Sequence, residues 1–215
     1  MFIQPSKGTT IENYDAIRAF CLYESDDAYP DQKISRIRVI LYLTSDYDFE
    51  DAFQGVEIGH MELYRTTWYY SSAEWADCHS GMLVDMHYLK EEVCGEGKRQ
   101  WNSTWFDENS MSSDHFFLTE MYLKPEFRQK GLGYKAMHTG LIECGASHNF
   151  VYVYPSKREE DMGFKYLKKF YMGMDEGTRY SSKYGTIVCP IYNYGDTAKK
   201  ESSRVPVREL STVAG

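Results

Sequence analysis

The sequence predicts an α/β (α+β) domain in which helices pack on a mixed β-sheet. Three observations favour this class. A strand, a glycine turn, a helix and a second strand follow one another over residues 115–154. Two hydrophobic stretches, 34–45 and 55–67, are separated by an acidic turn and have the composition of strands. The tyrosine-rich segment 179–194 is typical of a closing pair of strands.

Length and composition indicate a single folding unit. A chain of 215 residues with 42% hydrophobic content can bury about 70% of its unfolded surface in one core. We therefore expect one domain over residues 1–194. The segment 195–215 is polar and has no hydrophobic period, so we expect a flexible tail there.

Charge and cysteine content restrict the function classes. A net charge of −8 and a pI near 5.3 argue against nucleic acid as a partner, because phosphate neutralisation needs a basic face. No secretory signal pattern and no apolar run of membrane-spanning length is found. The cysteines are odd in number and lack zinc spacing, which predicts reduced thiols, no metal site and a cytoplasmic protein. They are Cys21, Cys78, Cys94, Cys144 and Cys189.

The N-terminal part is expected to contribute one helix and two strands. Apolar residues at helical spacing predict a helix over 10–30 that begins at Thr9 or Thr10 and stops at Pro30. The strands 34–45 and 55–67 follow. His60 lies on the second strand, neither face of which is wholly apolar, and such a histidine is more typical of structure than of catalysis.

Residues 68–114 form an acidic insertion with a helical pattern from Ala76 to Cys94. A loop of this length in a compact domain carries its own structure or a function. Two interpretations stay open. It is either a solvated, mainly helical insertion packed by its aromatic residues, or a lid whose negative charge attracts a cationic amine.

The central unit begins with a strand at 115–123, which Pro125 ends. The helix that starts near Leu132 has one apolar face, and Gly145 is placed to end it. The next strand covers 150–154. A later helix is expected over 156–174, with Ser156 and Glu159 as a capping box and Gly173 as its stop.

Two glycines at the start of the central helix indicate a phosphate site. Without side chains, Gly131 and Gly133 let a ligand reach the free N–H groups of the first turn, beside basic residues. A P-loop is excluded because Tyr134 follows Gly133 where lysine is required. A dinucleotide fingerprint fails as well, since the next strand ends at Tyr154 and not at an acidic residue.

Arg128, Gly131 and Gly133 resemble the pyrophosphate loop of the GNAT superfamily of N-acetyltransferases, whose signature is Arg or Gln, two residues, Gly, one residue, then Gly or Ala. The likeness covers 34–190 in element order and is motif-specific over about 118–137. It implies a mostly antiparallel, twisted sheet with helices on both faces. It also implies that the strand before the turn bulges and splays from its parallel neighbour, which opens a wedge for pantetheine.

The resemblance also assigns the binding residues for acetyl-coenzyme A, the co-substrate that it implies. Met121 and Leu123 would offer backbone contacts to pantetheine and to the oxyanion. The pyrophosphate would bind the turn residues through their main chain. These are Arg128, Gln129, Lys130, Gly131, Leu132 and Gly133.

Three residues are candidates for proton transfer. Glu120 occupies the strand position where many superfamily members place an acid facing the acceptor; it would take the ammonium proton, or only orient the substrate. Tyr171 matches the family pattern Leu-x-x-Phe-Tyr and would protonate the thiolate, with Tyr166 as the reserve. Two departures from the family stand nearby: Gly173 comes early after the tyrosine, and Pro155 and Ser156 replace a frequent asparagine.

The sequence thus predicts direct acetyl transfer from acetyl-coenzyme A to a primary amine of a small molecule or of an exposed protein or peptide site. The expected acceptor is cationic. A non-catalytic binding module with the same fold is the alternative, and a tRNA-directed acetyltransferase toxin is disfavoured by the acidic composition. The sequence does not decide between a monomer and a homodimer.

Overall fold

The computed structural model describes eight stretches of the chain: residues 16–25, 34–44, 55–67, 76, 81–94, 114–155, 163–174 and 177–191. These contain seven strands, three α-helices and one short 3-10 helix. In chain order they are β1 (Ala16–Ser25), β2 (Ser35–Thr44), β3 (Val56–Thr67), α2 (Gly81–Cys94), β4 (Asp114–Leu123), η3 (Pro125–Phe127), α3 (Leu132–Glu143), β5 (Asn149–Val153), α4 (Phe164–Met172), β6 (Arg179–Ser181) and β7 (Thr186–Ile191).

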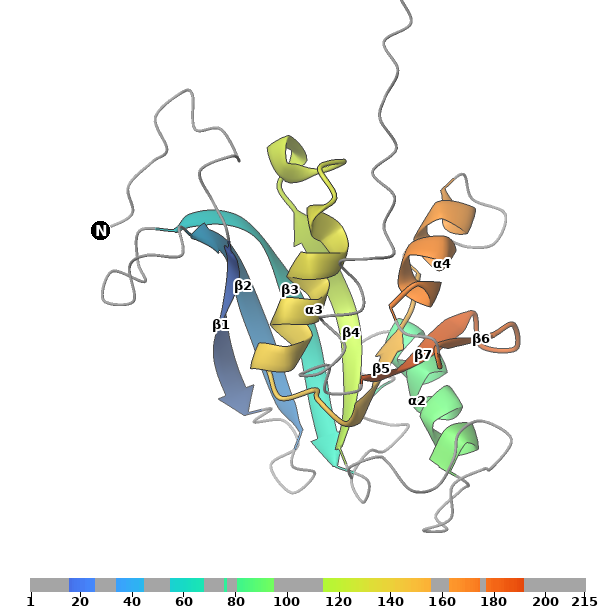
Figure 1. The fold of residues 1–215 in the computed structure, drawn as a ribbon. Coiled ribbons are helices and arrows are strands. Elements are labelled where there is room, and N and C mark those ends of the chain that lie inside the picture. Colours follow the sequence, from blue (N-terminus) through green and yellow to red (C-terminus); the bar gives the residue numbers. More distant parts are fainter. Residues whose placement is uncertain are drawn as a thin grey trace, which may run out of the picture.

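All seven strands belong to one sheet with the order β1-β2-β3-β4-β5-β7-β6 (Figure 1). Every neighbouring pair is antiparallel except β4 and β5, which run parallel on either side of α3 in the sequence. A parallel pair needs a crossover connection, and α3 supplies it. This mixed, mostly antiparallel sheet with helices confirms the predicted α/β (α+β) class.

The sheet has a hydrophobic core on each face. One core lies beneath α3, whose buried Ala136, Met137 and Leu141 pack on side chains of β1 to β4. The other lies beneath α2, where Leu83, Met86, Leu89 and Val93 pack against residues of β4, β5 and β7. Strands β4 and β5 contribute to both cores, which is why they read as nearly continuous hydrophobic runs.

The helix predicted over 10–30 is wrong for the part that the structure describes, because residues 16–25 form the edge strand β1. The spacing of Ile17, Phe20 and Cys21 fits a helix. Ile17, Ala19 and Cys21 also fit a strand, in which every second residue points to the same side. In the structure Ile17 is buried, whereas Phe20 points outward with 53% of its surface exposed. The ten-residue antiparallel pairing with β2 decides between the two patterns, and it is not local in sequence.

The strand–turn–helix–strand unit is confirmed closely. Helix α3 ends at Glu143, and Gly145 follows with φ 83° in the left-handed region. The Gly145 N–H bonds to the Ile142 carbonyl at 3.0 Å, and the Ala146 N–H bonds to Leu141 at 2.9 Å. These bonds satisfy the free carbonyls at the end of the helix, as the position of this glycine predicts.

The helix expected from Ser156 differs from what is observed. Helix α4 begins at Phe164, after Gly163 with φ 95°, a conformation that does not continue a helix. The proposed capping box of Ser156 and Glu159 lies outside the described residues. The predicted stop at Gly173 is confirmed, since its N–H bonds to the carbonyls of Lys169 and Phe170, both at 3.2 Å.

Of the insertion 68–114, the structure describes α2, the single residue Ala76 and the start of β4. Helix α2 confirms the helical pattern before Cys94. Of the acidic residues proposed for the lid, Asp85, Glu91 and Glu92 lie on α2 and Asp114 begins β4. Glu91 and Glu92 form ion pairs with Lys90 and Lys183. The other acidic residues of the insertion, and the tail 195–215, lie outside the described residues. Within the described part of the chain, none of the helices combines the length and apolar character needed to cross a membrane.

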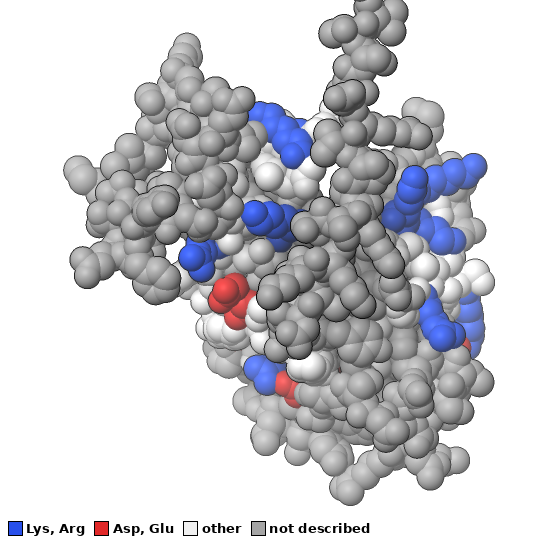
Figure 2. Space-filling view, in the orientation of Figure 1, with Lys and Arg blue, Asp and Glu red and all other residues white. Residues whose placement is uncertain are grey.

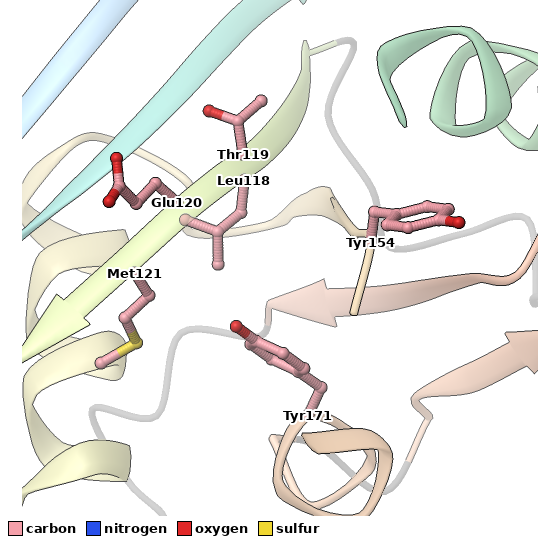
Figure 3. A pocket seen from close by; sticks show the side chains of 6 residues that line it. All are labelled: Leu118, Thr119, Glu120, Met121, Tyr154 and Tyr171. Atoms are coloured by element: carbon pink, nitrogen blue, oxygen red, sulfur yellow. The ribbon is translucent and has the colours of Figure 1, made fainter. Parts of the chain in front are cut away.

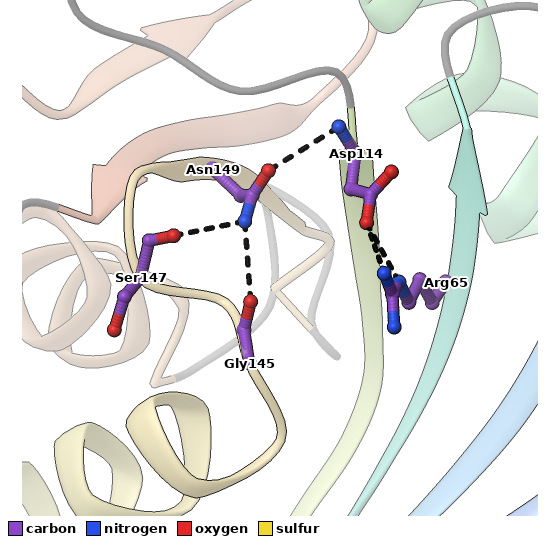
Figure 4. Close-up of polar contacts among 5 residues, drawn as sticks. All are labelled: Arg65, Asp114, Gly145, Ser147 and Asn149. Carbon is purple, nitrogen blue, oxygen red and sulfur yellow. Dashed lines mark hydrogen bonds and ion pairs between the residues drawn. The ribbon is translucent and has the colours of Figure 1, made fainter.

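A polar cluster ties together the starts of β4 and β5 (Figure 4). The Arg65 guanidinium on β3 donates both Nε, at 2.8 Å, and Nη2 to Asp114 Oδ2. The Asp114 N–H donates to Asn149 Oδ1 at 3.2 Å. Asn149 in turn donates Nδ2 to the carbonyls of Gly145, at 3.1 Å, and Ser147, at 2.9 Å. One buried asparagine therefore joins β4, β5 and the turn after α3.

Candidate functional site

A cavity of about 180 Å³ opens where the parallel strands stop pairing. The ladder between β4 and β5 runs from His115–Phe150 to Leu118–Val153. Beyond it, β4 continues to Leu123 and pairs only with β3 within the described residues. Four consecutive residues of β4, Tyr154 after β5 and Tyr171 of α4 line the space (Figure 3). Those four residues are Leu118, Thr119, Glu120 and Met121.

A β-bulge lies at the mouth of this cavity. Leu63 of β3 pairs with Leu118, but the preceding Glu62 pairs with Glu120, so that Thr119 is the extra residue. The Thr119 hydroxyl donates to the Glu62 carbonyl at 3.1 Å, which secures the bulge. An inserted residue reverses the side to which all later side chains point. Met121 therefore packs on the core beneath α3, whereas Glu120 points away from it.

The unpaired edge of β4 presents backbone groups to the cavity. In a strand, alternate residues direct their N–H and C=O groups to opposite neighbours. After Leu118, the N–H and C=O groups of β4 that point away from β3 have no strand partner in the described part of the chain. The carbonyl of Leu123 is already occupied, however, because Arg128 Nε donates to it at 2.7 Å.

The glycine turn leads into α3 with an open approach. Gln129 and Gly131 have φ of 60° and 74°, and Gly131 is the N-cap of the helix. A Cβ placed on Gly131 would meet no atom within 4 Å, so space is free in front of it. The first N–H groups of α3 have no carbonyl acceptor within the helix, and no side chain caps them. This end of α3 can accept an anion.

The surface around the turn is basic although the protein is acidic overall. Figure 2 shows Lys and Arg side chains gathered over the turn before α3 and over α4. The turn and the start of α3 carry Arg128, Lys130 and Lys135, and α4 carries Lys165, Lys168 and Lys169, all exposed or half-buried. We call these six residues the basic patch, although the Lys168 ammonium lies 3.4 Å from the centre of the Tyr180 ring. Local charge of this kind raises the concentration of an anionic ligand near the turn.

Arg128 is placed differently from its neighbours. Besides its bond to the Leu123 carbonyl, its guanidinium lies 5.1 Å from the centre of the Tyr122 ring. The side chain thus folds back along β4, and its cation–π contact adds to the anchor. Arg128 holds the turn against the strand, while Lys130 is an exposed cation of the turn itself.

The two tyrosine candidates occupy different environments. Tyr171 lines the cavity, and its hydroxyl points from α4 toward β4 (Figure 3). Burial raises its pKa to about 12, so it carries a proton at neutral pH. Tyr166 is 70% exposed on α4 and does not line the cavity. The geometry favours Tyr171 over Tyr166 as a donor into this space.

Glu120 borders the cavity, but its carboxylate points away from Tyr171 and toward β3 (Figure 3). There its Oε1 lies 3.7 Å from Nε2 of His60. The His60 ring in turn lies 5.3 Å from the ring of Tyr122. The acid and the tyrosine of the cavity therefore face opposite sides of the sheet.

Several residues of the site were not singled out from the sequence. Thr119 makes the bulge, and Tyr154 forms the wall opposite β4. Tyr134, in the first turn of α3, donates its hydroxyl to the Phe170 carbonyl at 2.6 Å, and the two rings are 4.6 Å apart. It joins the start of α3 to the end of α4. The position of Tyr134 directly after Gly133 was the sequence feature that could have indicated its place in the site.

Metal binding finds no support among the described residues, where no cluster of three or more His, Cys, Asp or Glu side chains occurs. Cys94 lies 3.6 Å from His115 Nε2, whose Nδ1 is 3.1 Å from the Tyr152 hydroxyl. This buried chain joins α2 to the sheet. Burial raises the pKa of the Cys94 thiol to about 12, which disfavours a thiolate there.

The comparisons with known proteins leave the assignment to the geometry: no protein-family model matches this chain, and no curated protein matches it either.

Proposed function

We propose that this protein is an acetyl-coenzyme A-dependent N-acetyltransferase that moves the acetyl group directly to a primary amine. One observation carries the proposal: β4 extends beyond the end of its parallel partner after Leu118, and a cavity opens at that point. The same strand then leads through η3 to the glycine turn. An elongated ligand with a diphosphate at one end and a thioester at the other fits this order of features. For the fold, we propose that β4 and β5 are the splayed parallel pair of a GNAT-like domain.

In this assignment the diphosphate binds the N–H groups from Gln129 to Gly133 and the positive end of α3. The free space in front of Gly131 supports this placement, as does the basic patch around the turn. Arg128 acts through structure, because its guanidinium is held by Leu123 and Tyr122. Lys130, which lies within the turn, is then the side chain whose positive charge would act on the diphosphate.

The pantetheine arm enters between β4 and Tyr154, along the unpaired backbone edge at Met121. There a main-chain N–H stabilises the oxyanion that forms when the amine attacks the thioester carbonyl. The C–N bond forms, the C–S bond breaks, and the thiolate leaves. Tyr171 donates its proton to the departing sulfur, a role supported by its position and its protonated state. The attacking nitrogen releases its second proton to solvent as the amide forms, and the Tyr171 hydroxyl regains a proton from solvent.

The attacking amine must first lose a proton, because an ammonium group has no lone pair. Glu120 is the acid that borders the cavity, and it takes this proton on the side of the sheet opposite Tyr171. Acceptor and co-substrate therefore approach from opposite faces. The acceptor is an amine of a small molecule or of an exposed protein or peptide site.

The test compares two glycines with the same backbone constraint. Gly131 and Gly145 both have positive φ, both have open space at the Cβ position, and they lie at opposite ends of α3. We expect Gly131→Glu to abolish binding of acetyl-coenzyme A and Gly145→Glu to retain it. Binding is measured by thermal stabilisation, which amounts to about 2.7 kcal/mol at a ligand concentration 100 times Kd.

Acetyl transfer is then assayed by mass shift on a panel of primary amines. Transfer to any of them supports the enzyme. If acetyl-coenzyme A binds but is neither transferred to an amine nor hydrolysed, the result supports the non-catalytic alternative. Equal stabilisation of the Gly131→Glu and Gly145→Glu variants contradicts the assignment of the glycine turn.

A further inference from the structure

Four carboxylates lie on the two central strands β3 and β4, and three of them have a cationic partner. Glu57 Oε1 is 3.2 Å from Lys124 Nζ, and Glu62 Oε2 is 2.9 Å from Arg36 Nη2. Asp114 is paired with Arg65. Each of these three side chains thus has a structural ion pair.

Glu120 is the exception. Among the described residues its ion-pair partner is His60, with Nε2 at 3.7 Å from Oε1. This distance is too long for a direct hydrogen bond, but it lies within the range of an ion pair once the imidazole is protonated. The Glu120 side chain is 52% exposed and that of His60 is 23% exposed, so a substrate can reach the acid.

The surroundings of His60 hold its ring in place. His60 and Tyr122 are directly opposite each other on β3 and β4, with their rings 5.3 Å apart. Tyr122 is covered in turn by the Arg128 guanidinium. Because Glu120 and Tyr122 are two residues apart after the bulge, both share the face of His60. Without the extra Thr119, Glu120 would point into the core beneath α3.

We propose that His60 is a positioning residue of the acetyl transfer. Its imidazole takes on the proton that Glu120 removes from the ammonium group, and the imidazolium so formed pairs with the Glu120 carboxylate on the acceptor side. This inference rests on the proposed function. The proton moves from the amine nitrogen to Glu120 Oε1 and from there, through a bridging water, to His60 Nε2, because 3.7 Å is too long for a direct transfer. The imidazolium returns it to solvent after the C–N bond has formed, and Glu120 is again ionised.

The test measures kcat and KM on the amine panel for the full chain and for His60→Gln, which keeps a hydrogen-bonding nitrogen but cannot take a proton. We expect kcat to fall about tenfold, with the KM for acetyl-coenzyme A unchanged. In a Glu120→Gln background the same change should cause no further loss, because His60 acts through Glu120. His138→Gln, the same substitution on α3, serves as the control and should keep full turnover.

Losses from His60→Gln and Glu120→Gln that multiply in the double variant overturn the inference, as does full turnover of His60→Gln. If His60→Gln does not fold, His60→Asn is measured in the same cycle. A wild-type protein that binds acetyl-coenzyme A but acetylates no amine is a separate result: it overturns the proposed function, and this inference with it.

Discussion

The two halves of β4 have opposite surroundings. From His115 to Leu118 the strand is paired on both sides and buried, and the preceding Asp114 is bonded to Asn149 of β5. From Thr119 to Leu123 it pairs only with β3 in the described part of the chain and lines the cavity. We refer to these segments as the closed half and the open half.

The difference shows how a sheet can make a cleft without losing its core. The contacts of Asn149 fix the register of the parallel pair at its base. Since β5 ends at Val153, the register then determines that pairing stops at Leu118. The bulge follows directly, so the strand changes its partners and the direction of its side chains within two residues. A stable closed half is thus the condition for an exact position of the open half.

The largest expected effect is on stability in the closed half. Phe117 is fully buried, with its ring 5.3 Å from that of Tyr152. We expect Phe117→Ala to lower the free energy of unfolding by about 4 kcal/mol. The matched change Tyr122→Ala, in the half-buried open half, should cost clearly less. Urea unfolding measures both, and equal losses would contradict the distinction between the halves.

The next effect is on turnover in the open half. In the proposed acetyl transfer we expect Tyr171→Phe to lower kcat by about 10²-fold, because the departing thiolate would lose its proton donor. Binding of acetyl-coenzyme A should change little. Tyr166→Phe is the control on the exposed side of the same helix. A normal rate for Tyr171→Phe, or a loss for Tyr166→Phe, would reassign the donor.

Removal of the Asn149 side chain, which joins the starts of β4 and β5, should destabilise the closed half. Asn149 is buried, and its side chain makes three hydrogen bonds, to Asp114, Gly145 and Ser147. Asn149→Ala leaves those backbone groups unsatisfied, and we expect a loss of about 2 kcal/mol in urea unfolding. Asn149→Asp keeps the acceptor for Asp114 but not the two donors. Its carboxylate would face the carbonyls of Gly145 and Ser147 in a buried site, so we expect a loss at least as large as that of the alanine variant.

Alkaline pH provides a second test of the open half. The pKa of Tyr171 is about 12 in the folded protein against 10.0 for the free side chain. As the pH rises past 10, the unfolded chain loses this proton first, so stability falls between pH 10 and pH 12 and is unaffected below. We expect Tyr171→Phe to lose about 1.4 kcal/mol less than the wild type between pH 8 and pH 11. Parallel declines would contradict the burial of this hydroxyl.

The smallest effect should come from the bulge. Thr119→Val keeps the shape of the side chain but removes the hydrogen bond to the Glu62 carbonyl. We expect a loss of about 1 kcal/mol in the free energy of unfolding. Because the bulge aims Glu120, turnover should fall together with stability. A stable variant with normal turnover would show that the backbone alone maintains the bulge.

The sequence predicted the central unit well because its signals are local. Pro125 ends β4, Gly131 and Gly145 bound α3, and the apolar face of α3 is the buried one. Spacing along the chain is enough to recognise such features. The glycine turn was found for the same reason, since its shape depends on residues that are neighbours in sequence.

One prediction failed where the deciding contact is distant. Residues 16–25 suited a helix until their pairing with β2 was known. The sequence also contained no sign that the Arg128 side chain folds onto Tyr122 and Leu123. In both segments local spacing left the structure open, and contacts with another strand or with a backbone carbonyl selected it.

The sequence by itself determined that this chain forms a mixed sheet around a glycine turn at the start of a helix, because glycine, proline and hydrophobic spacing act within a few residues. Only the tertiary structure decided that Glu120 faces His60 and that Tyr171 faces the cavity. A bulge depends on how two strands align, and one extra residue reverses the side to which the following residues point.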